Sequence, residues 1–166
     1  GYTDVVSMHQ AGMENVVASS GTSLTIDQIK LIKRFTNNIT LLFDGDAAGL
    51  KAAMRGVNLI LQEGLNVKVV TFPDGEDPDS YAKKVSSQEL EDYIDKEAKD
   101  FIAFKCSLLL EEAKEDPIKR AELIKDVAAT IGLIPDYVSR TVYAQTSSKI
   151  LGVEEQVIFS TIDQSR

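Results

Sequence analysis

Along the first half of the chain, short apolar runs alternate with segments of helical periodicity. Residues 39–43 form a continuous run of apolar and β-branched residues, typical of a strand covered on both faces, and residues 67–72 are predicted as the next strand. Between them, apolar side chains recur at helical spacing from about residue 47 to residue 63, and Gly64 is placed to cap the end of that helix. Strands that alternate with helices predict βαβ units and a parallel sheet.

Shorter elements are predicted before these. Residues 16–18 are predicted to form a short strand, and Thr25 is placed to cap a helix that runs from about residue 26 to residue 35. His9 falls in a further predicted helix between Asp4 and Gly12, where no acid or nucleophile pattern accompanies it, so no catalytic role is assigned to it.

The second half has no strand-like run. Ser86 and Glu89 have the spacing of a capping box, and Asp116-Pro117 has the form of a helix cap followed by the first helical residue. The pattern predicts helices over about residues 87–96, 100–115, 117–131, 135–151 and 154–163. We therefore predict an α/β domain over residues 1–85, followed by an all-helical subdomain over residues 86–166.

Composition fits a globular protein of the cytoplasm. Of the 166 residues, 43% are hydrophobic and 27% are charged, which allows a core and argues against disorder. No apolar run approaches the length of a membrane span, and the start shows no signal segment, so no membrane partner is expected. The single cysteine, Cys106, excludes an internal disulfide, and no Cys/His cluster has zinc spacing.

The net charge of −8 argues at first against a nucleic-acid partner. Residues 1–80, however, contain 6 Lys/Arg and 10 Asp/Glu, and five of those acids are candidates for a single metal site. Without these five the segment carries a net charge of +1. The acidity is thus concentrated where a cation would neutralise it, and a nucleic-acid partner is not excluded. The five acids are Asp4, Asp44, Asp46, Asp77 and Asp79.

The sharpest motif is the acidic loop that follows residues 39–43. Asp44 and Asp46 lie where a buried strand ends and a helix begins, which is where ligands bind in open parallel sheets. Alternate residues of an extended stretch point the same way, so both carboxylates are able to converge on one point. Such hard oxygen ligands suit Mg²⁺ or Mn²⁺, and Gly45 and Gly49 allow a tight turn and the close approach of a phosphate.

A second acidic cluster occupies residues 74–79, directly after the predicted strand 67–72, and Asp4 contributes a third loop. Acids from three loops that meet at one sheet edge would supply a two-metal phosphoryl-transfer site. The alternative is an ordinary turn or a calcium loop, because Asp-x-Asp, Asp-Gly and Asp-Pro pairs are common in both. An EF-hand is disfavoured, since Ala48 stands where its third ligand belongs.

Several stretches, in the same order and at the same intervals, resemble the topoisomerase–primase (toprim) domain in the form found in bacterial DnaG-type primases. The helical half resembles the subdomain that follows toprim in these primases, so the resemblance covers nearly the whole chain. The matching stretches are residues 1–4, 20–25, 43–49 with its continuation 51–55, 76–79, 116–121 and 134–136.

This resemblance implies a toprim-like parallel sheet with flanking helices and a Mg²⁺- or Mn²⁺-dependent nucleotidyl transfer that makes short RNA primers. The metal ligands would be Asp44, Asp46, Asp77 and Asp79, and the catalytic residues would be Asp4, Asp44 and Asp46. Two basic residues of one helix face would contact nucleotide or template phosphates, and a solvated helix face is the alternative reading for them. These are Lys51 and Arg55.

The resemblance also has a departure. In the family a catalytic glutamate directly precedes the Gly-Tyr-x-Asp motif, and here Gly1 is the first residue. We therefore expect the glutamate and the first strand to be missing from this chain, and the chain alone to be inactive. The implied partners are single-stranded DNA and ribonucleoside triphosphates, with a replicative helicase bound through another region. The alternatives are another toprim enzyme, such as a nuclease or a topoisomerase piece, and a non-catalytic helical docking module.

Overall fold

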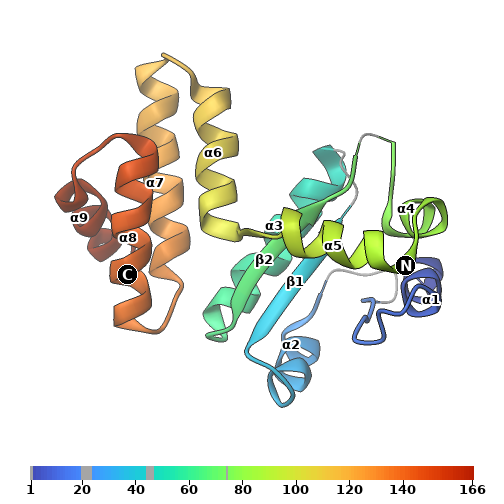
Figure 1. Cartoon of the computed structure of the whole chain (residues 1–166). Helices are drawn as coiled ribbons and strands as arrows, with labels where there is room; N and C mark the ends of the chain where they lie inside the picture. Colours follow the sequence, from blue (N-terminus) through green and yellow to red (C-terminus); the bar gives the residue numbers. More distant parts are fainter. Residues whose placement is uncertain (1, 20–23, 44–46, 74) are drawn as a thin grey trace. The chain divides into compact units, whose positions relative to one another are not determined.

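The computed structural model describes residues 2–19, 24–43, 47–73 and 75–166, except for the side chains of residues 43 and 47–52. By its contacts the chain divides into two compact units, residues 1–60 with 66–99, and residues 61–65 with 100–166 (Figure 1). The elements are, in order, α1 (Tyr2–Gln10), α2 (Ile26–Lys33), β1 (Asn38–Phe43), α3 (Ala47–Gln62), β2 (Asn66–Thr71), α4 (Pro78–Lys84), α5 (Ser87–Glu97), β3 (Lys99–Asp100), α6 (Phe101–Ala113), α7 (Pro117–Gly132), α8 (Tyr137–Leu151) and α9 (Glu155–Ser165).

The predicted βαβ unit is confirmed. Strands β1 and β2 pair in parallel, from Asn38 opposite Asn66 to Phe43 opposite Thr71, and α3 connects them. The sheet has the order β1-β2-β3. Phe43 and Thr71 are the last paired residues, so β1 and β2 end at the same edge of the sheet.

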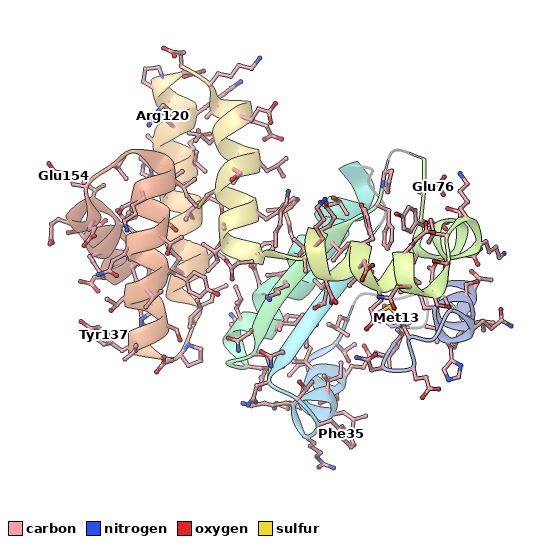
Figure 2. All side chains as sticks on the ribbon, in the orientation of Figure 1. Met13, Phe35, Glu76, Arg120, Tyr137 and Glu154 are labelled. Carbon is pink, nitrogen blue, oxygen red and sulfur yellow. The ribbon has the colours of Figure 1, made fainter. Side chains whose placement is uncertain are left out.

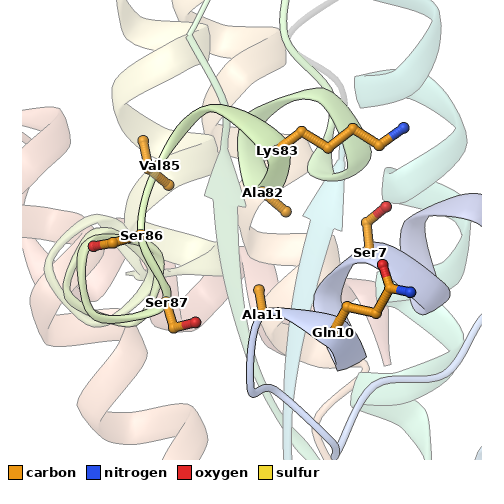
Figure 3. A pocket seen from close by; sticks show the side chains of 8 residues that line it. All are labelled: Ser7, Gln10, Ala11, Ala82, Lys83, Val85, Ser86 and Ser87. Carbon is orange, nitrogen blue, oxygen red and sulfur yellow. The ribbon is translucent and has the colours of Figure 1, made fainter.

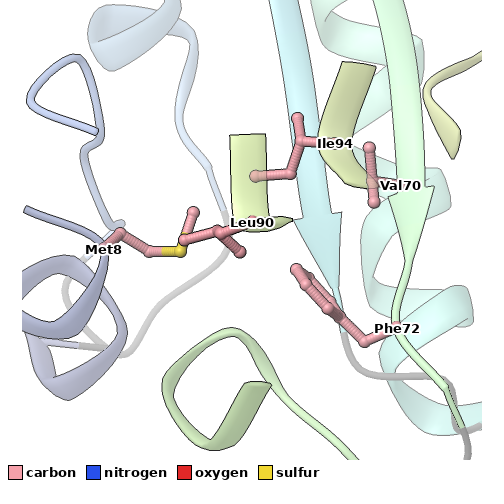
Figure 4. Packing of buried hydrophobic residues seen from close by; sticks show 5 residues of the cluster. All are labelled: Met8, Val70, Phe72, Leu90 and Ile94. Atoms are coloured by element: carbon pink, nitrogen blue, oxygen red, sulfur yellow. The ribbon is translucent and has the colours of Figure 1, made fainter. Parts of the chain in front are cut away.

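One hydrophobic cluster joins α1, β2 and α5 (Figure 4). Met8 of α1 and Leu90 of α5 are completely buried, as is Val70 of β2, and Phe72 and Ile94 complete the cluster. Burial of such side chains stabilises the fold by roughly 1.5–3 kcal/mol each. The cluster therefore fixes α1, which carries Asp4, relative to the sheet.

Two local predictions need correction. Residues 16–18 do not form a strand: Val16 packs beside the cluster, but Val17 is 77% exposed, and the run has no partner strand among the described residues. The acidic stretch that was predicted as a loop instead leads into a helix, α4, because Asp77-Pro78 supplies an N-cap and a first helical residue.

By its contacts the first compact unit extends through α5 to Lys99. The domain boundary at residue 85, which marks the change from strands to helices, stays a prediction. Helix α5 packs by Leu90 and Ile94 into the cluster that it shares with α1 and β2. The hydrophobic pattern held no information on which core a helix would join.

The second unit contains α6 to α9 together with residues 61–65. Helix α7 contacts α6, α8 and α9, and its buried residues include Val127, Ala128 and Ile131. Gly152 ends α8 in the left-handed region at φ +67°, as its predicted place between two helices requires. No helix in the described ranges is both long enough and apolar enough to cross a membrane.

Tyr143 is expected to make the stability of this second unit depend on pH in the alkaline range. Its hydroxyl donates to Oδ1 of Asp100, and Oδ2 of Asp100 accepts from the backbone amides of Ile102 and Ala103 at the start of α6. Burial, with the neighbouring Asp100, raises the pKa of Tyr143 well above its usual range. In the unfolded chain the phenol would lose its proton near pH 10, as an ordinary tyrosine does. The stabilisation is therefore present below about pH 10 and is lost as the pH rises further.

We expect Tyr143→Phe to lower the free energy of unfolding by about 1 kcal/mol at neutral pH, the usual worth of one hydrogen bond. The difference from the wild type should shrink as the pH rises above about 10, because only the wild type loses its Tyr143 contribution. Thermal melts followed by circular dichroism from about pH 7 to about pH 11 measure this. Tyr137→Phe is the matched control, since Tyr137 is 71% exposed. Parallel pH curves for wild type and Tyr143→Phe would contradict the assignment.

Candidate functional site

The acids of the first and last sequence motifs meet where α1 contacts α4. Asp4 lies in the first turn of α1, and its Oδ1 accepts the backbone N–H of Asp79 at 3.0 Å, although 75 residues separate the two. The first backbone N–H groups of any helix lack partners inside that helix. Asp4 supplies such a partner from another element, so it fixes the start of α4. We call Asp4, Asp77 and Asp79 the acidic edge.

Asp77 is the N-cap residue of α4. Its Oδ1 accepts the backbone N–H of Ser80 at 2.7 Å, and the Ser80 hydroxyl accepts the backbone N–H of Asp77 at 3.0 Å, which completes a capping box. An aspartate in this position typically stabilises a helix by about 1 kcal/mol. Asp77 thus has a structural role that is independent of any metal, and that role uses Oδ1.

Asp79 is held on both sides of its carboxylate. The hydroxyl of Ser7, on α1, donates to Oδ1, and the ammonium of Lys83 lies 3.3 Å from the carboxylate oxygens. The hydrogen bond from Ser7, with a smaller contribution from Lys83, lowers the pKa of Asp79 against the opposing effect of desolvation. Asp79 is therefore ionised at neutral pH, as a metal ligand must be.

Glu76 completes the arrangement at the start of α4 (Figure 2). Its carboxylate contacts the ammonium of Lys84 and accepts the hydroxyl of Ser80, and these bonds, the one from Lys84 first, lower the pKa of Glu76. Glu76 is thereby drawn toward α4. Its partners, Lys84 and Ser80, offset its charge. The predicted metal ligands of this stretch are Asp77 and Asp79.

A surface hollow is lined by residues of α1 and α4 and of the start of α5 (Figure 3). Ser7 and Lys83, the two side chains that contact the Asp79 carboxylate, both line it, so solvent reaches the neighbourhood of this acid. The other lining residues are Gln10, Ala11, Ala82, Val85, Ser86 and Ser87.

The structure describes only part of the remaining predicted site residues. Asp44 and Asp46 lie outside the described residues, as does the side chain of Lys51, whereas Arg55 is exposed on α3. Across the described part of the chain, no three His, Cys, Asp or Glu side chains are grouped so that they could hold a metal ion. The roles of all these residues stay predictions.

The chemistry of the donors nevertheless fits a hard divalent cation. Asp4, Asp77 and Asp79 present carboxylate oxygens, the ligands that Mg²⁺ and Mn²⁺ prefer. The ammonium of Lys83, whose side chain is 69% exposed, forms an ion pair with Asp79, and solvent weakens ion pairs of this kind. A divalent cation would displace it at little cost.

Several contacts of the acidic edge were not found from the sequence. Ser80 carried a usable signal, because it stands three residues after Asp77 in the spacing of a capping box. Ser7 carried none: its role depends on the packing of α1 against α4, which no local pattern encodes.

Comparison with known proteins gives one family match. Residues 1–82 match the model of a Toprim-like domain. Over 163 residues, the chain is 34% identical to a DNA primase of Clostridium acetobutylicum, a match that covers 98% of this chain and 27% of that protein. The chain thus spans about a quarter of the length of this curated relative.

Solved structures agree with this match. A DNA primase domain from Pseudomonas aeruginosa is similar with a TM-score of 0.85 and 30% identity, over 98% of this chain and 52% of that one. A DnaG primase catalytic domain bound to single-stranded DNA is similar with a TM-score of 0.81 and 32% identity, over 94% of this chain and 50% of that one. The likeness extends over both compact units.

Proposed function

Because this chain belongs to the bacterial DnaG-type primases with a toprim domain, we propose that it forms the metal-binding part of a primase catalytic core together with the helical region that follows. The longer protein would synthesise short RNA primers on single-stranded DNA during replication, in the bacterial cytoplasm. The other readings, a different toprim enzyme or a helical docking module, find no support among these relatives, which are DNA primases and primase catalytic domains.

The single observation that carries the proposal is the contact between Asp4 and Asp79. It brings the first and last of the acidic motifs together, at 3.0 Å between backbone nitrogen and carboxylate oxygen. The level ends of β1 and β2 add support, because Asp44 directly follows β1 in the sequence and the stretch with Asp77 follows β2. The acids of one phosphoryl-transfer site would be assembled in this way.

In the proposed reaction a 3′-hydroxyl attacks the α-phosphate of a ribonucleoside triphosphate, and pyrophosphate leaves. A bound Mg²⁺ or Mn²⁺ supplies positive charge that offsets the charge of the phosphates. Asp44, Asp46, Asp77 and Asp79 would hold the cation. Asp4 would keep α4, and with it Asp79, in place from the side of α1.

Two basic residues extend the proposal to the substrate and template. Lys51 and Arg55 belong to α3, which begins three residues after Asp44, and lie one helical turn apart. They would contact phosphates of the nucleotide or of the template strand. The solved relative bound to single-stranded DNA supports a DNA template as the partner, and a replicative helicase stays a predicted partner of the longer protein.

The chain alone is expected not to synthesise primers. It spans about a quarter of the length of a curated relative and about half of the solved primase domains. The proposed activity therefore belongs to the longer protein, and binding of the cation is the property that this chain can be tested for directly.

Asp77 allows the metal-binding role to be separated from helix capping. Asparagine is as good an N-cap as aspartate but lacks the charge, whereas alanine loses both functions. We expect Asp77→Asn and Asp77→Ala each to weaken Mn²⁺ binding by about tenfold or more, since outer partners of a ligand alone are worth about that much. In chelator, only Asp77→Ala should melt lower, by about 2–4 °C for a loss of about 1 kcal/mol.

Calorimetric titration with Mn²⁺ and thermal melts in chelator measure the two effects. Asp95→Asn is the matched control, because Asp95 is an exposed aspartate on α5 outside the acidic edge, and it should change neither property. If Asp77→Asn binds Mn²⁺ as the wild type does, Asp77 is a capping residue only. If Asp44→Asn and Asp79→Asn also bind normally, the proposed metal site is wrong.

A further inference from the structure

Ser7 is a buried hydroxyl residue in contact with a proposed metal ligand. It is 8% exposed and lies on α1 three residues after Asp4, so both residues share one face of the helix. Helical serines commonly bond back to a carbonyl of their own helix. The Ser7 hydroxyl instead donates to Oδ1 of Asp79, on α4.

The packing of α1 into the hydrophobic cluster fixes the position of the Ser7 hydroxyl. Met8, the next residue of α1, is completely buried in the cluster that contains Leu90 and Val70, so α1 cannot shift without disturbing that core. Helix α1 also holds the main chain of Asp79 through Asp4, at 3.0 Å. One rigid helix thus binds both the backbone and the side chain of the same aspartate.

The two contacts leave Asp79 little rotational freedom. With its backbone amide bonded to Asp4 and its Oδ1 bonded to Ser7, the carboxylate has one favoured orientation. The other oxygen, Oδ2, contacts Lys83 at 3.3 Å, and the side chain of Lys83 is 69% exposed. A long, exposed lysine leaves such a pair easily, whereas the buried hydroxyl of Ser7 stays.

We infer that Ser7 is a positioning residue of the metal site: its hydroxyl holds the carboxylate of Asp79 in the orientation that binds the cation through Oδ2. This inference rests on the proposed function, since Ser7 can position a metal ligand only if Asp79 is one. Hydrogen-bond donors behind carboxylate ligands act in this way at many metal sites, and their loss costs about 10–100-fold in metal affinity.

Two substitutions remove the donor while they leave the helix intact. Ser7→Ala deletes the hydroxyl, and alanine is the best helix former. Ser7→Cys keeps nearly the same size, and its S–H is only a weak donor. We expect both variants of this chain to bind Mn²⁺ about tenfold more weakly than the wild type in calorimetric titration. Ser87→Ala is the matched control, because Ser87 lines the same hollow with an exposed hydroxyl, and it should bind Mn²⁺ normally.

Melting temperatures in chelator separate positioning from plain stabilisation. If Ser7→Ala or Ser7→Cys melts lower but binds Mn²⁺ as the wild type does, Ser7 only fastens α1 to α4 and the inference is overturned. Asp79→Asn distinguishes this failure from that of the proposed function. Normal Mn²⁺ binding by Asp79→Asn would remove Asp79 from the metal site altogether, whereas weak binding by Asp79→Asn with normal binding by Ser7→Ala would overturn the role of Ser7 alone.

Discussion

Asp46→Asn in the longer protein is expected to reduce primer synthesis by about a thousandfold or more. A metal that offsets charge on a transferring phosphoryl group contributes several kcal/mol to the transition state. A loss of about 4 kcal/mol corresponds to about a thousandfold in rate. Asparagine preserves the size of the side chain and one oxygen, so the effect isolates the carboxylate charge. Incorporation of labelled ribonucleotides on a single-stranded DNA template measures it.

The matched control for this experiment is again Asp95→Asn, which should leave primer synthesis unchanged because Asp95 is an exposed aspartate of α5. Both variants should keep the melting temperature of the wild type in chelator to within a few degrees, so that lost activity is not lost folding. Activity of Asp46→Asn within about tenfold of the wild type would exclude Asp46 from the catalytic centre.

The part of the fold that the sequence predicted well is the part that local patterns encode. Strands β1 and β2 and the longer helices follow from apolar periodicity and from caps such as Asp116 and Ser86. Strand β3 has only two residues, too few for a pattern. The run at 16–18 has strand-like residues, but a strand also needs a neighbour, and that neighbour is a tertiary property.

The candidate site likewise has features that local sequence patterns encode and features that depend on tertiary packing. The order of the acidic motifs indicated that Asp4 and the stretch around Asp79 would meet, and the structure brings these two residues into contact. The hydrogen bond from Ser7 joins two residues that lie 72 positions apart in the sequence, so no local signal marks it. Sequence patterns identify the residues that carry charge, and packing decides which neutral side chains orient them.

Asp126 shows most clearly that a sequence pattern does not reveal the tertiary contacts of a side chain. Its sequence context is that of an ordinary surface acid on a helix. In the structure its Oδ1 accepts a hydrogen bond at 2.9 Å from Lys105, a lysine that is only 5% exposed. The ammonium also donates to the hydroxyl of Thr130 at 2.7 Å, and that hydroxyl donates to the backbone carbonyl of Asp126 at 3.1 Å. A closed polar network therefore joins α6 and α7.

We expect Asp126→Ala to lower the free energy of unfolding by about 2–3 kcal/mol. This is less than the cost of breaking a fully buried ion pair, because Asp126 itself is half exposed. The loss arises chiefly from the ammonium of Lys105, which would remain buried without its counter-charge. The matched control is Glu122→Ala, an exposed acid of the same helix α7 with expected effects within about 0.5 kcal/mol. Urea unfolding followed by circular dichroism measures these differences.

The double variant Lys105→Met/Asp126→Ala identifies the origin of the loss. Methionine has nearly the length of lysine and no charge, so it fills the same space between α6 and α7 without requiring a partner. If the uncompensated ammonium causes the destabilisation, the double variant should recover to within about 1 kcal/mol of the wild type, more stable than Asp126→Ala alone. If the loss arises instead from other contacts of Asp126, the double variant will be no more stable than Asp126→Ala. An Asp126→Ala variant that unfolds at the same urea concentration as Glu122→Ala would show that Thr130 alone satisfies the buried lysine.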